Sequence, residues 1–337
     1  MLTSCAIIRI AMRLLLLPIL IPALTYAAAP PTAAPALLPN EVAVILNSAE
    51  GTVSLIDRRT YEVVKRYPIG KEPHHLVISP DEKELIVANA SGNELVFLDP
   101  VTGIEKHRLK RISDPYQLGF SPDHKWFLSI SLRLDRVDIY NAKDFSLAKR
   151  IEVGKTPSHV AFAQDSSMAF VTMQESGDIA AIDLNAQKVV WRLPVGKQPA
   201  GIYVTPDGKN LMVGVMGSNY FSVVDWRARK VVKQITTGDG AHNLQSMGDG
   251  KRVLVSNRVS GTVNIIQLSD FTVVGTIKIP NGPDDMELTR DGKELWVTSR
   301  WSHKVYVVDM ANFQVKKIIP VGRSPHGIYV HSHAPRT

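Results

Sequence analysis

Short runs of apolar residues alternate with turn residues along almost the whole chain, and each run has the length of a β-strand. One stretch shows the pattern clearly, with apolar runs at 202–205, 210–215, 221–224 and 231–236. A tight turn with the sequence Pro206-Asp207-Gly208 separates the first two runs. Proline presets φ for a turn, and aspartate can bond its own backbone there. The pattern predicts a unit of four antiparallel strands.

The unit repeats with a period of 42 residues, without net insertion or deletion. A proline marks the start of the first strand in all copies but one, where Ala241 takes its place. The proline positions are Pro73, Pro115, Pro157, Pro199, Pro283 and Pro325. A second marker ends the third strand of each copy, at Asp57, Asp99, Asn141, Asp183, Asp225, Gln267 and Asp309. A period of about 40–45 residues made of short strands is typical of propeller blades. We therefore predict an all-β fold, a seven-bladed β-propeller of four-stranded antiparallel blades.

The two ends of the repeat region complement each other. Residues 41–69 supply strands two, three and four of a unit, whereas residues 323–330 supply only a first strand. Together they would form one blade and close the ring, which leaves no open sheet edge between the first and last units. We assign 41–337 to the propeller.

The first 40 residues do not follow the repeat. Arg9 and Arg13 precede an apolar run at 14–24, and small residues follow at 25–29. This order is typical of a secretory signal peptide, which we place at 1–29. Residues 30–40 are rich in proline and alanine and are expected to form a flexible linker. The apolar run is short and broken by prolines, so we predict a periplasmic or secreted protein without a membrane span in the mature chain.

Charge and cysteine content narrow the function classes. The 337-residue chain carries a net charge of +7, spread along its length. Such a balance attracts anions, but it lacks the dense basic patch of a nucleic-acid binder. The single cysteine, Cys5, precedes the apolar run, so the mature chain would have no disulfide, thiolate metal site or cysteine nucleophile. We expect a monomer that does not bind nucleic acid.

Two segments resemble the repeat of the YVTN family of β-propellers. They are Ile86-Val-Ala-Asn-Ala-Ser-Gly-Asn-Glu-Leu-Val-Phe-Leu-Asp99 and Leu295-Trp-Val-Thr-Ser-Arg-Trp-Ser-His-Lys-Val-Tyr-Val-Val-Asp309. The resemblance extends over all seven units and implies the propeller fold. The family includes secreted and periplasmic proteins and is similar to the eight-bladed propeller that holds haem d1 in nitrite reductases. The resemblance implies no single activity, because function on a shared fold depends on the site.

The copies differ most in the two residues that follow the repeated proline. These residues begin the innermost strand, near one mouth of the axis, on the face that we call the top face. Four neighbouring blades contribute His242, Asp284, His326 and His74 at the first position. His75, Asn243 and Asp285 stand beside them at the second position, whereas Ser158, Ala200 and Gly201 on the opposite side offer little chemistry. A second loop on the same face carries Arg258, Arg300 and Trp301.

One interpretation is a metal site, or a cofactor that carries a metal such as haem d1. Imidazole and carboxylate groups ligate Zn, Cu, Fe and Ni. The candidate ligands are His74, His242, Asp284 and His326.

The interpretation that the sequence favours is a site for a small molecule or protein partner on the top face. Arg258 and Arg300 would hold a carboxylate or phosphate group as bidentate forks, and Trp301 would stack on the ligand. The protein would then be an exported, non-catalytic binding propeller.

Two alternatives remain open. In a lactonase-like hydrolase, Asp284 and Asp285 with His326 would provide a general base. Catalytic groups usually occupy specialised loops, and every unit keeps its 42-residue length, which disfavours an enzyme. In the second alternative, the histidines and asparagine bond only to the loop backbone and have a purely structural role.

Overall fold

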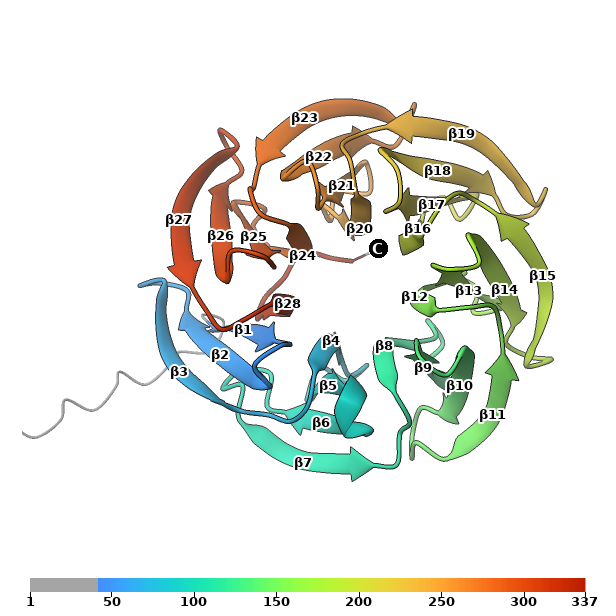
Figure 1. Cartoon of the computed structure of the whole chain (residues 1–337), viewed down its shortest axis with the longest axis horizontal. Coiled ribbons are helices and arrows are strands. Elements are labelled where there is room, and N and C mark those ends of the chain that lie inside the picture. Colours follow the sequence, from blue (N-terminus) through green and yellow to red (C-terminus); the bar gives the residue numbers. More distant parts are fainter. Residues whose placement is uncertain (1–41, 337) are drawn as a thin grey trace, which may run out of the picture. The chain divides into compact units, whose positions relative to one another are not determined.

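The computed structural model describes residues 42–336, and these residues form a ring of seven four-stranded antiparallel sheets (Figure 1). The predicted seven-bladed propeller is therefore confirmed. Apart from a single 3-10 turn, η1 (Ala90–Gly92), all regular elements within 42–336 are strands. No helix within 42–336 is long and apolar enough to cross a membrane. The predicted signal peptide (1–29) and linker (30–40) lie outside the described residues.

The strands fall into four sets, from the axis outward. The innermost strands are β4 (Pro73–Ile78), β8 (Pro115–Phe120), β12 (Pro157–Phe162), β16 (Pro199–Val204), β20 (Ala241–Ser246), β24 (Pro283–Leu288) and β28 (Pro325–Val330). The second strands are β5 (Leu85–Asn89), β9 (Trp126–Ser131), β13 (Met168–Met173), β17 (Asn210–Val215), β21 (Arg252–Asn257), β25 (Glu294–Ser299) and β1 (Val42–Asn47). The third strands are β6 (Glu94–Leu98), β10 (Arg136–Asn141), β14 (Asp178–Asp183), β18 (Tyr220–Asp225), β22 (Thr262–Gln267), β26 (Lys304–Asp309) and β2 (Thr52–Asp57). The outermost strands are β7 (Glu105–Lys110), β11 (Leu147–Glu152), β15 (Lys188–Pro194), β19 (Lys230–Thr236), β23 (Thr272–Lys278), β27 (Gln314–Pro320) and β3 (Glu62–Pro68).

One blade is built from both ends of the described chain. Its strand order is β28-β1-β2-β3, with Ala43 of β1 opposite Val330 of β28 and Ile45 opposite Ile328. The other six blades use consecutive strands. This arrangement confirms the predicted closure and covers the edge of β1 that would otherwise be unpaired.

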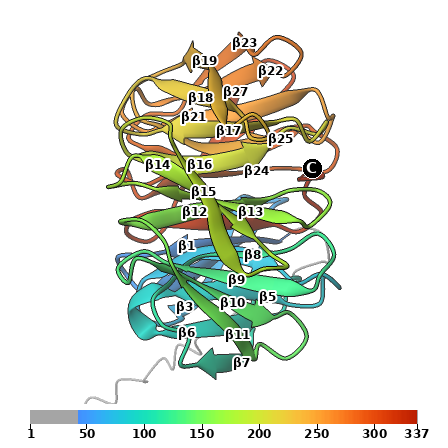
Figure 2. The ribbon, with the colours of Figure 1, turned by 90° about the vertical axis from the view of Figure 1, so that its right-hand side faces the viewer.

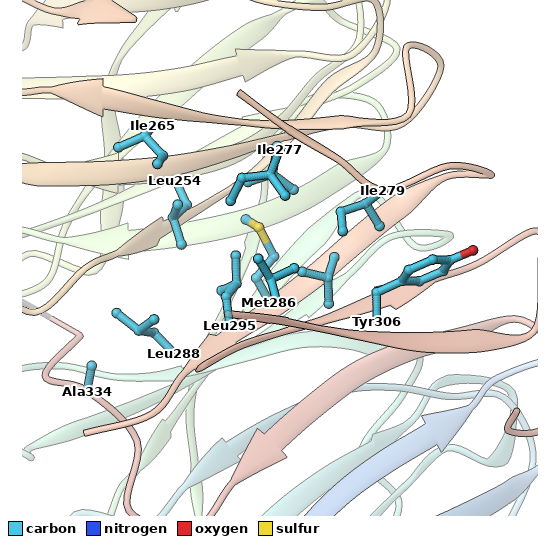
Figure 3. Close-up of a cluster of buried hydrophobic side chains, with 12 residues drawn as sticks. Leu254, Ile265, Ile277, Ile279, Met286, Leu288, Leu295, Tyr306 and Ala334 are labelled. Carbon is cyan, nitrogen blue, oxygen red and sulfur yellow. The ribbon is translucent and has the colours of Figure 1, made fainter. Parts of the chain in front are cut away.

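The core lies between neighbouring blades. Figure 3 shows one such interface, where Leu254 and Ile265 of one blade face Met286 and Leu295 of the next. These side chains are at most 4% exposed. Burying a side chain of this size contributes about 1.5–3 kcal/mol. A blade has two apolar faces, so each blade depends on both neighbours for its stability.

A bulge interrupts every innermost strand directly after its first residue. In β24, Pro283 pairs with Ser299 and Met286 pairs with Val297, so three steps on β24 oppose two on β25. The same offset occurs in the other six blades. Bulges redirect side chains and are frequent beside functional sites. In six of the seven blades, the two residues after the first residue of the innermost strand have no partner in the ladder. In β8, Gln117 keeps a partner, Ile130.

The chain beyond β28 crosses the end of the neighbouring innermost strand. The Arg290 backbone N–H donates to the Ser332 carbonyl at 2.9 Å, and the Ala334 N–H donates to the Leu288 carbonyl at 2.7 Å. This C-terminal segment reaches the centre of the ring in Figure 1 and lies at one face of it in Figure 2. It thereby brings Arg336 into contact with Glu287 of β24.

Candidate functional site

The first residues after the repeated proline form a buried layer across the axis, which we call the upper layer. Within it, His74 is 2% exposed, and His242, Asp284 and His326 are fully buried. The ring centroids of His74 and His326 are 3.8 Å apart, and those of His242 and His326 are 6.4 Å apart. The structure thus brings together the four residues that the sequence suggests as metal ligands.

The second residues after the proline form a lower layer on the axis. His75 lies 4.5 Å from His326 and 5.1 Å from His159, measured between ring centroids. Asn243 donates through Nδ2 to Asp285 Oδ1 at 2.6 Å. The sequence predicts His75, Asn243 and Asp285 beside the upper-layer residues at the top-face mouth. The structure places them beside that layer, where they line an axial cavity.

Sequence reasoning missed two members of the cluster, His159 and Tyr116. The ring centroids of Tyr116 and His74 are 4.0 Å apart, with the ring planes tilted by 32°. His159 occupies the same register as His75, but the preceding Ser158 made its blade look chemically poor. The shared register was the signal that could have identified it.

Asp284 is the centre of the upper layer's charge network. Its Oδ1 lies 3.0 Å from His242 Nδ1, and its Oδ2 lies 3.4 Å from His326 Nε2. Arg258 forms an ion pair with Oδ1, and Arg300 Nη1 lies 3.4 Å from Oδ2. Burial opposes ionisation, but the charge of Arg258 and the two imidazoles outweigh it and hold the pKa of Asp284 well below its usual range.

The two predicted arginines therefore contact a residue of the protein itself. Their side chains are 14% and 26% exposed, and they cover Asp284 from the top face. Trp301 follows directly in sequence but is 56% exposed. A Cβ added at Gly282 would lie 2.8 Å from the Trp301 ring, which places this indole against the loop between β23 and β24. The indole therefore lies at the protein surface and not in the buried axial cluster.

Asp285 differs from Asp284 in having no guanidinium among its polar contacts. Besides Asn243, its neighbours are His75 Nδ1 at 3.5 Å and His326 Nδ1 at 3.4 Å from Oδ2. Burial raises the pKa of Asp285, but His326 and His75 more than compensate, so the pKa lies well below its usual range. An ionised carboxylate therefore stands on the axis beside imidazoles.

Several imidazole nitrogens in the cluster have no hydrogen-bond partner within 42–336. They are His74 Nδ1, His75 Nε2, His159 Nε2 and His242 Nε2. Burial lowers the pKa of His74 and His159 well below the usual value and that of His242 to about 4. These three rings are therefore neutral at pH 7, and a neutral imidazole offers one nitrogen lone pair.

Two groups of side chains have the composition of a metal site. Donor atoms of His74, His75 and His326 all lie within 4.8 Å of one another, and the same holds for Asp284, Asp285 and His326. Bond lengths of about 2.0–2.2 Å place the ligands of one ion within about 4 Å of each other. Small side-chain rotations would bring either group into that range, and His326 is common to both.

A cavity of about 380 Å³ follows the axis below this cluster. The lower layer forms its inner end, and later residues of the innermost strands form its walls as far as Arg336. No upper-layer residue and neither of the top-face arginines lines it. The accessible side of the cluster is therefore the face opposite the top face, which we call the lower face.

A second cavity, of about 610 Å³, lies beside the first at the lower face. Its lining includes two turns that connect innermost and second strands, at Pro122 and Pro206. Phe120, Phe162, Ile202 and Arg336 line both cavities. The two spaces therefore meet beside Arg336.

Comparison with known proteins adds a family and a fold. A family model described as "YNCE-like beta-propeller" matches residues 4–336. The 6-phosphogluconolactonase of Bacillus subtilis (strain 168) is 25% identical over 134 residues, which are 34% of this chain and 38% of that protein. The match thus spans well under half of that relative.

Solved structures share the ring architecture at low sequence identity. A functionally unknown protein from Desulfotomaculum acetoxidans DSM 771 matches with a TM-score of 0.74 at 14% identity, over 86% of this chain and 98% of its own. The dihydro-haem d1 dehydrogenase NirN in complex with DHE gives 0.68 at 17%, over 88% and 76%. Hydrazine synthase of Kuenenia stuttgartiensis gives 0.64 at 20%, over 76% and 88%. At these identities, the likeness concerns the fold alone.

The axial residues do not fit a haem-type cofactor. A macrocycle needs an axial imidazole that projects at a face wide enough to hold the ring, but His74, His242 and His326 are at most 2% exposed. On the top side, Arg258 and Arg300 cover the cluster through their ion pairs with Asp284. A single ion needs only converging donor atoms, which the cluster provides.

Proposed function

The chain belongs to the YNCE-like beta-propeller family, and from that premise we propose that this member binds one divalent transition-metal ion on the axis of its ring. The observation that carries the proposal is the convergence of buried imidazoles, four of whose nitrogens lack hydrogen-bond partners within 42–336, beside two ionised carboxylates. Imidazole and carboxylate donors suit Zn²⁺, Ni²⁺ and Cu²⁺.

A purely structural role for the histidines explains the cluster less well. A buried polar atom left without a partner costs about 1–3 kcal/mol, and the axis gathers four such atoms in one place. Structural imidazoles normally find a backbone or side-chain partner. A bound cation would accept the lone pairs of His74 and His75 and balance the charge of Asp285.

We assign His74, His75, His326 and Asp285 as the primary ligand set. The three imidazoles form the all-histidine group, and Asp285 Oδ2 lies within 3.5 Å of two of them. Asp284 would act as the neighbouring carboxylate that orients His326 and His242. Metal-bound histidines commonly donate their second N–H to such a carboxylate.

The top-face site for an anion or protein partner receives less support from the geometry. Arg258 and Arg300, which were expected to grip the ligand, already contact Asp284. A ligand on the top face would have to compete with a buried carboxylate for both guanidinium groups.

Metal titration of the chelator-treated protein tests the proposal. We expect calorimetry and elemental analysis to find one Zn²⁺, Ni²⁺ or Cu²⁺ ion per chain, and His75→Ala to weaken binding at least about tenfold. His107→Ala is the matched control, because that imidazole lies on the outer strand β7 with its side chain 52% exposed. Absence of stoichiometric binding by the wild-type protein would refute the proposal.

Export remains a proposal that rests on the sequence of the first 29 residues. N-terminal sequencing of protein from the periplasm or medium of the native host should find a start near residue 30. A cytoplasmic, uncleaved chain would contradict export.

Hydrolysis of a small lactone is a second candidate, which the partial match to a 6-phosphogluconolactonase favours. Asp285 lines the axial cavity and is the carboxylate placed to accept a proton from water. We expect Asp285→Asn to abolish any turnover found in a panel of lactones. No turnover by the metal-loaded wild-type protein across that panel would remove this candidate.

A further inference from the structure

The carboxylates of the axial cavity lie on one of its walls, where strands β20 and β24 run side by side. Asn243 of β20 bonds to Asp285 of β24 at 2.6 Å. Two residues further along both strands, Gln245 Nε2 donates to Glu287 Oε1 at 3.4 Å. Two carboxylates, each held by an amide from the next blade, thus follow one another along the same cavity.

The two ends of the axis carry opposite charge. Arg258 and Arg300 cover the metal cluster at the top face, whereas Asp285 and Glu287 line the approach from the lower face. Like charges repel and opposite charges attract over distances of a few ångströms. A free cation is therefore drawn towards the cluster from below and repelled from above.

The outer carboxylate of this wall, Glu287, already forms an ion pair with a cationic side chain. Arg336 pairs with Glu287, which is 2% exposed, while the arginine side chain remains 32% exposed. The C-terminal segment holds the guanidinium there through its backbone bonds to Leu288 and Arg290. A buried carboxylate requires a compensating positive charge, and Arg336 supplies it in this structure.

We propose that divalent cations reach the axial metal site from the lower face, and that Glu287 is an outer cation-binding site that Arg336 occupies in the metal-free protein. This inference rests on the proposed metal-binding function. The unpartnered His75 Nε2 and His159 Nε2 belong to residues that line the same cavity, further inward. An arriving ion thus meets a carboxylate first and free imidazoles next.

The size of the cavity agrees with this route. Six waters of an ion's hydration shell take up about 180 Å³ at about 30 Å³ each, and the cavity measures about 380 Å³. A hydrated ion can therefore pass Glu287 before it exchanges water for imidazole ligands.

Stopped-flow mixing with Co²⁺, followed by the absorption of the bound ion, tests the route. We expect Glu287→Gln to lower the association rate constant about tenfold and Arg336→Gln to raise it about threefold. Glu287→Asp keeps the charge and should remain within about twofold of the wild type. Glu72→Gln is the matched control at the top face, where this carboxylate pairs with Arg133, and it should change nothing.

Each outcome decides the question. Unchanged association in both Glu287→Gln and Arg336→Gln would overturn the route, and if Glu287→Gln fails to fold, Arg336→Gln alone decides. Equilibrium stoichiometry after prolonged incubation separates the two proposals. If the wild-type protein binds one Co²⁺ and neither substitution changes the association rate constant, only the route is refuted. If the wild-type protein never binds Co²⁺, the metal site is refuted as well.

Discussion

Two kinds of aspartate stand on the same 42-residue lattice and behave in opposite ways. Asp225 ends the third strand of its blade and accepts a 2.8 Å hydrogen bond from the backbone N–H of Ala228. Asp183 does the same in the preceding blade, with the N–H groups of Asn185 and Ala186 at 2.9 and 2.8 Å. Asp284 has no acidic counterpart in any other blade and binds side chains from two others. Residues that repeat in every blade therefore stabilise the fold of the ring. Residues that occur in one blade only can form a single site on the axis.

The glycines near the start of some innermost strands, such as Gly201 and Gly327, also differ from the repeated positions in their role. A Cβ added at Gly201 would clash with the carbonyl oxygen of His242, and one added at Gly327 would lie 2.8 Å from the carbonyl oxygen of His74. Glycine is thus required where neighbouring backbones approach closely. These glycines allow the histidine-bearing strands to come near enough for their rings to meet.

The largest expected effect comes from removing the charge of Asp284. Asp284→Asn would leave Arg258 and Arg300 facing each other over a buried amide, and we expect it to lower the free energy of unfolding by about 3 kcal/mol. Urea denaturation with an unchanged m-value would measure the loss. A loss below about 1 kcal/mol would place Asp284 with the ordinary, replaceable positions of the ring.

The second largest effect is expected from acid, which should destabilise the protein through the axial histidines. The folded-state pKa of His242 is about 4, below the value of about 6.5 in an unfolded chain, so the unfolded state binds more protons between these values. The contribution of each such histidine to the free energy of unfolding is therefore fully present above about pH 6.5. It falls by about 1.4 kcal/mol per pH unit as the pH decreases below that value. His74 and His159 act in the same direction.

Denaturation of chelator-treated protein between pH 7 and pH 5.5 measures this slope, in a range where ordinary aspartates keep their charge. His159→Asn should reduce the slope by the share of one histidine. His107→Asn removes an exposed imidazole and should leave the slope as it is. An equal slope in all three proteins would mean that the axial rings titrate like surface histidines.

Much of the fold and of the axial cluster could be predicted from the sequence. In a closed ring of equal repeats, the position of a residue within its repeat determines where it lies relative to the axis. The blade number, the closure of the ring and the meeting of His74, His75, His242 and His326 all follow from equal spacing in the sequence. Residues in equivalent positions of neighbouring blades must stand side by side around the axis. No knowledge of side-chain conformation is needed for that step.

Other features of the site depend on geometry that no spacing reveals. The bulge turns two successive residues towards the axis, so His159 joins the cluster although Ser158 precedes it. Whether Arg258 and Arg300 hold a ligand or Asp284 depends on their rotamers. The accessible face depends on the C-terminal segment that places Arg336, and this segment lies outside the repeat.

The bulge offers a test with a matched pair of substitutions. The Thr298 hydroxyl accepts a bond from the Asp285 N–H at 3.1 Å and donates to the His326 carbonyl at 3.0 Å. Thr172 is its counterpart in another blade, with His159 N–H at 3.1 Å and the Ala200 carbonyl at 2.7 Å. Valine at either position should cost about 1 kcal/mol of stability.

Only one of the two should alter metal binding. Thr298 orients Asp285 and His326, which belong to the assigned ligand set, so Thr298→Val should weaken Zn²⁺ binding about tenfold. Thr172→Val orients neither and should leave the calorimetric affinity unchanged. If both variants lose affinity equally, the ligand set must extend to the blade of His159.

The smallest effect is expected at the repeated aspartates, and the sequence itself supplies the reason. Asn141 occupies the position equivalent to Asp225 and forms the same kind of turn bond, from the Lys143 N–H to Asn141 Oδ1 at 2.9 Å. Because the turn needs an acceptor rather than a charge, Asp225→Asn should change the free energy of unfolding by less than about 0.5 kcal/mol. Asp225→Ala removes the acceptor and should cost about 1 kcal/mol. Urea denaturation of both variants beside Asp284→Asn places the two kinds of aspartate on one scale. A large loss of unfolding free energy in Asp225→Asn would show that the charge of the repeated carboxylates stabilises the protein. Repetition alone would then not identify a position whose only role is to accept a hydrogen bond in a turn.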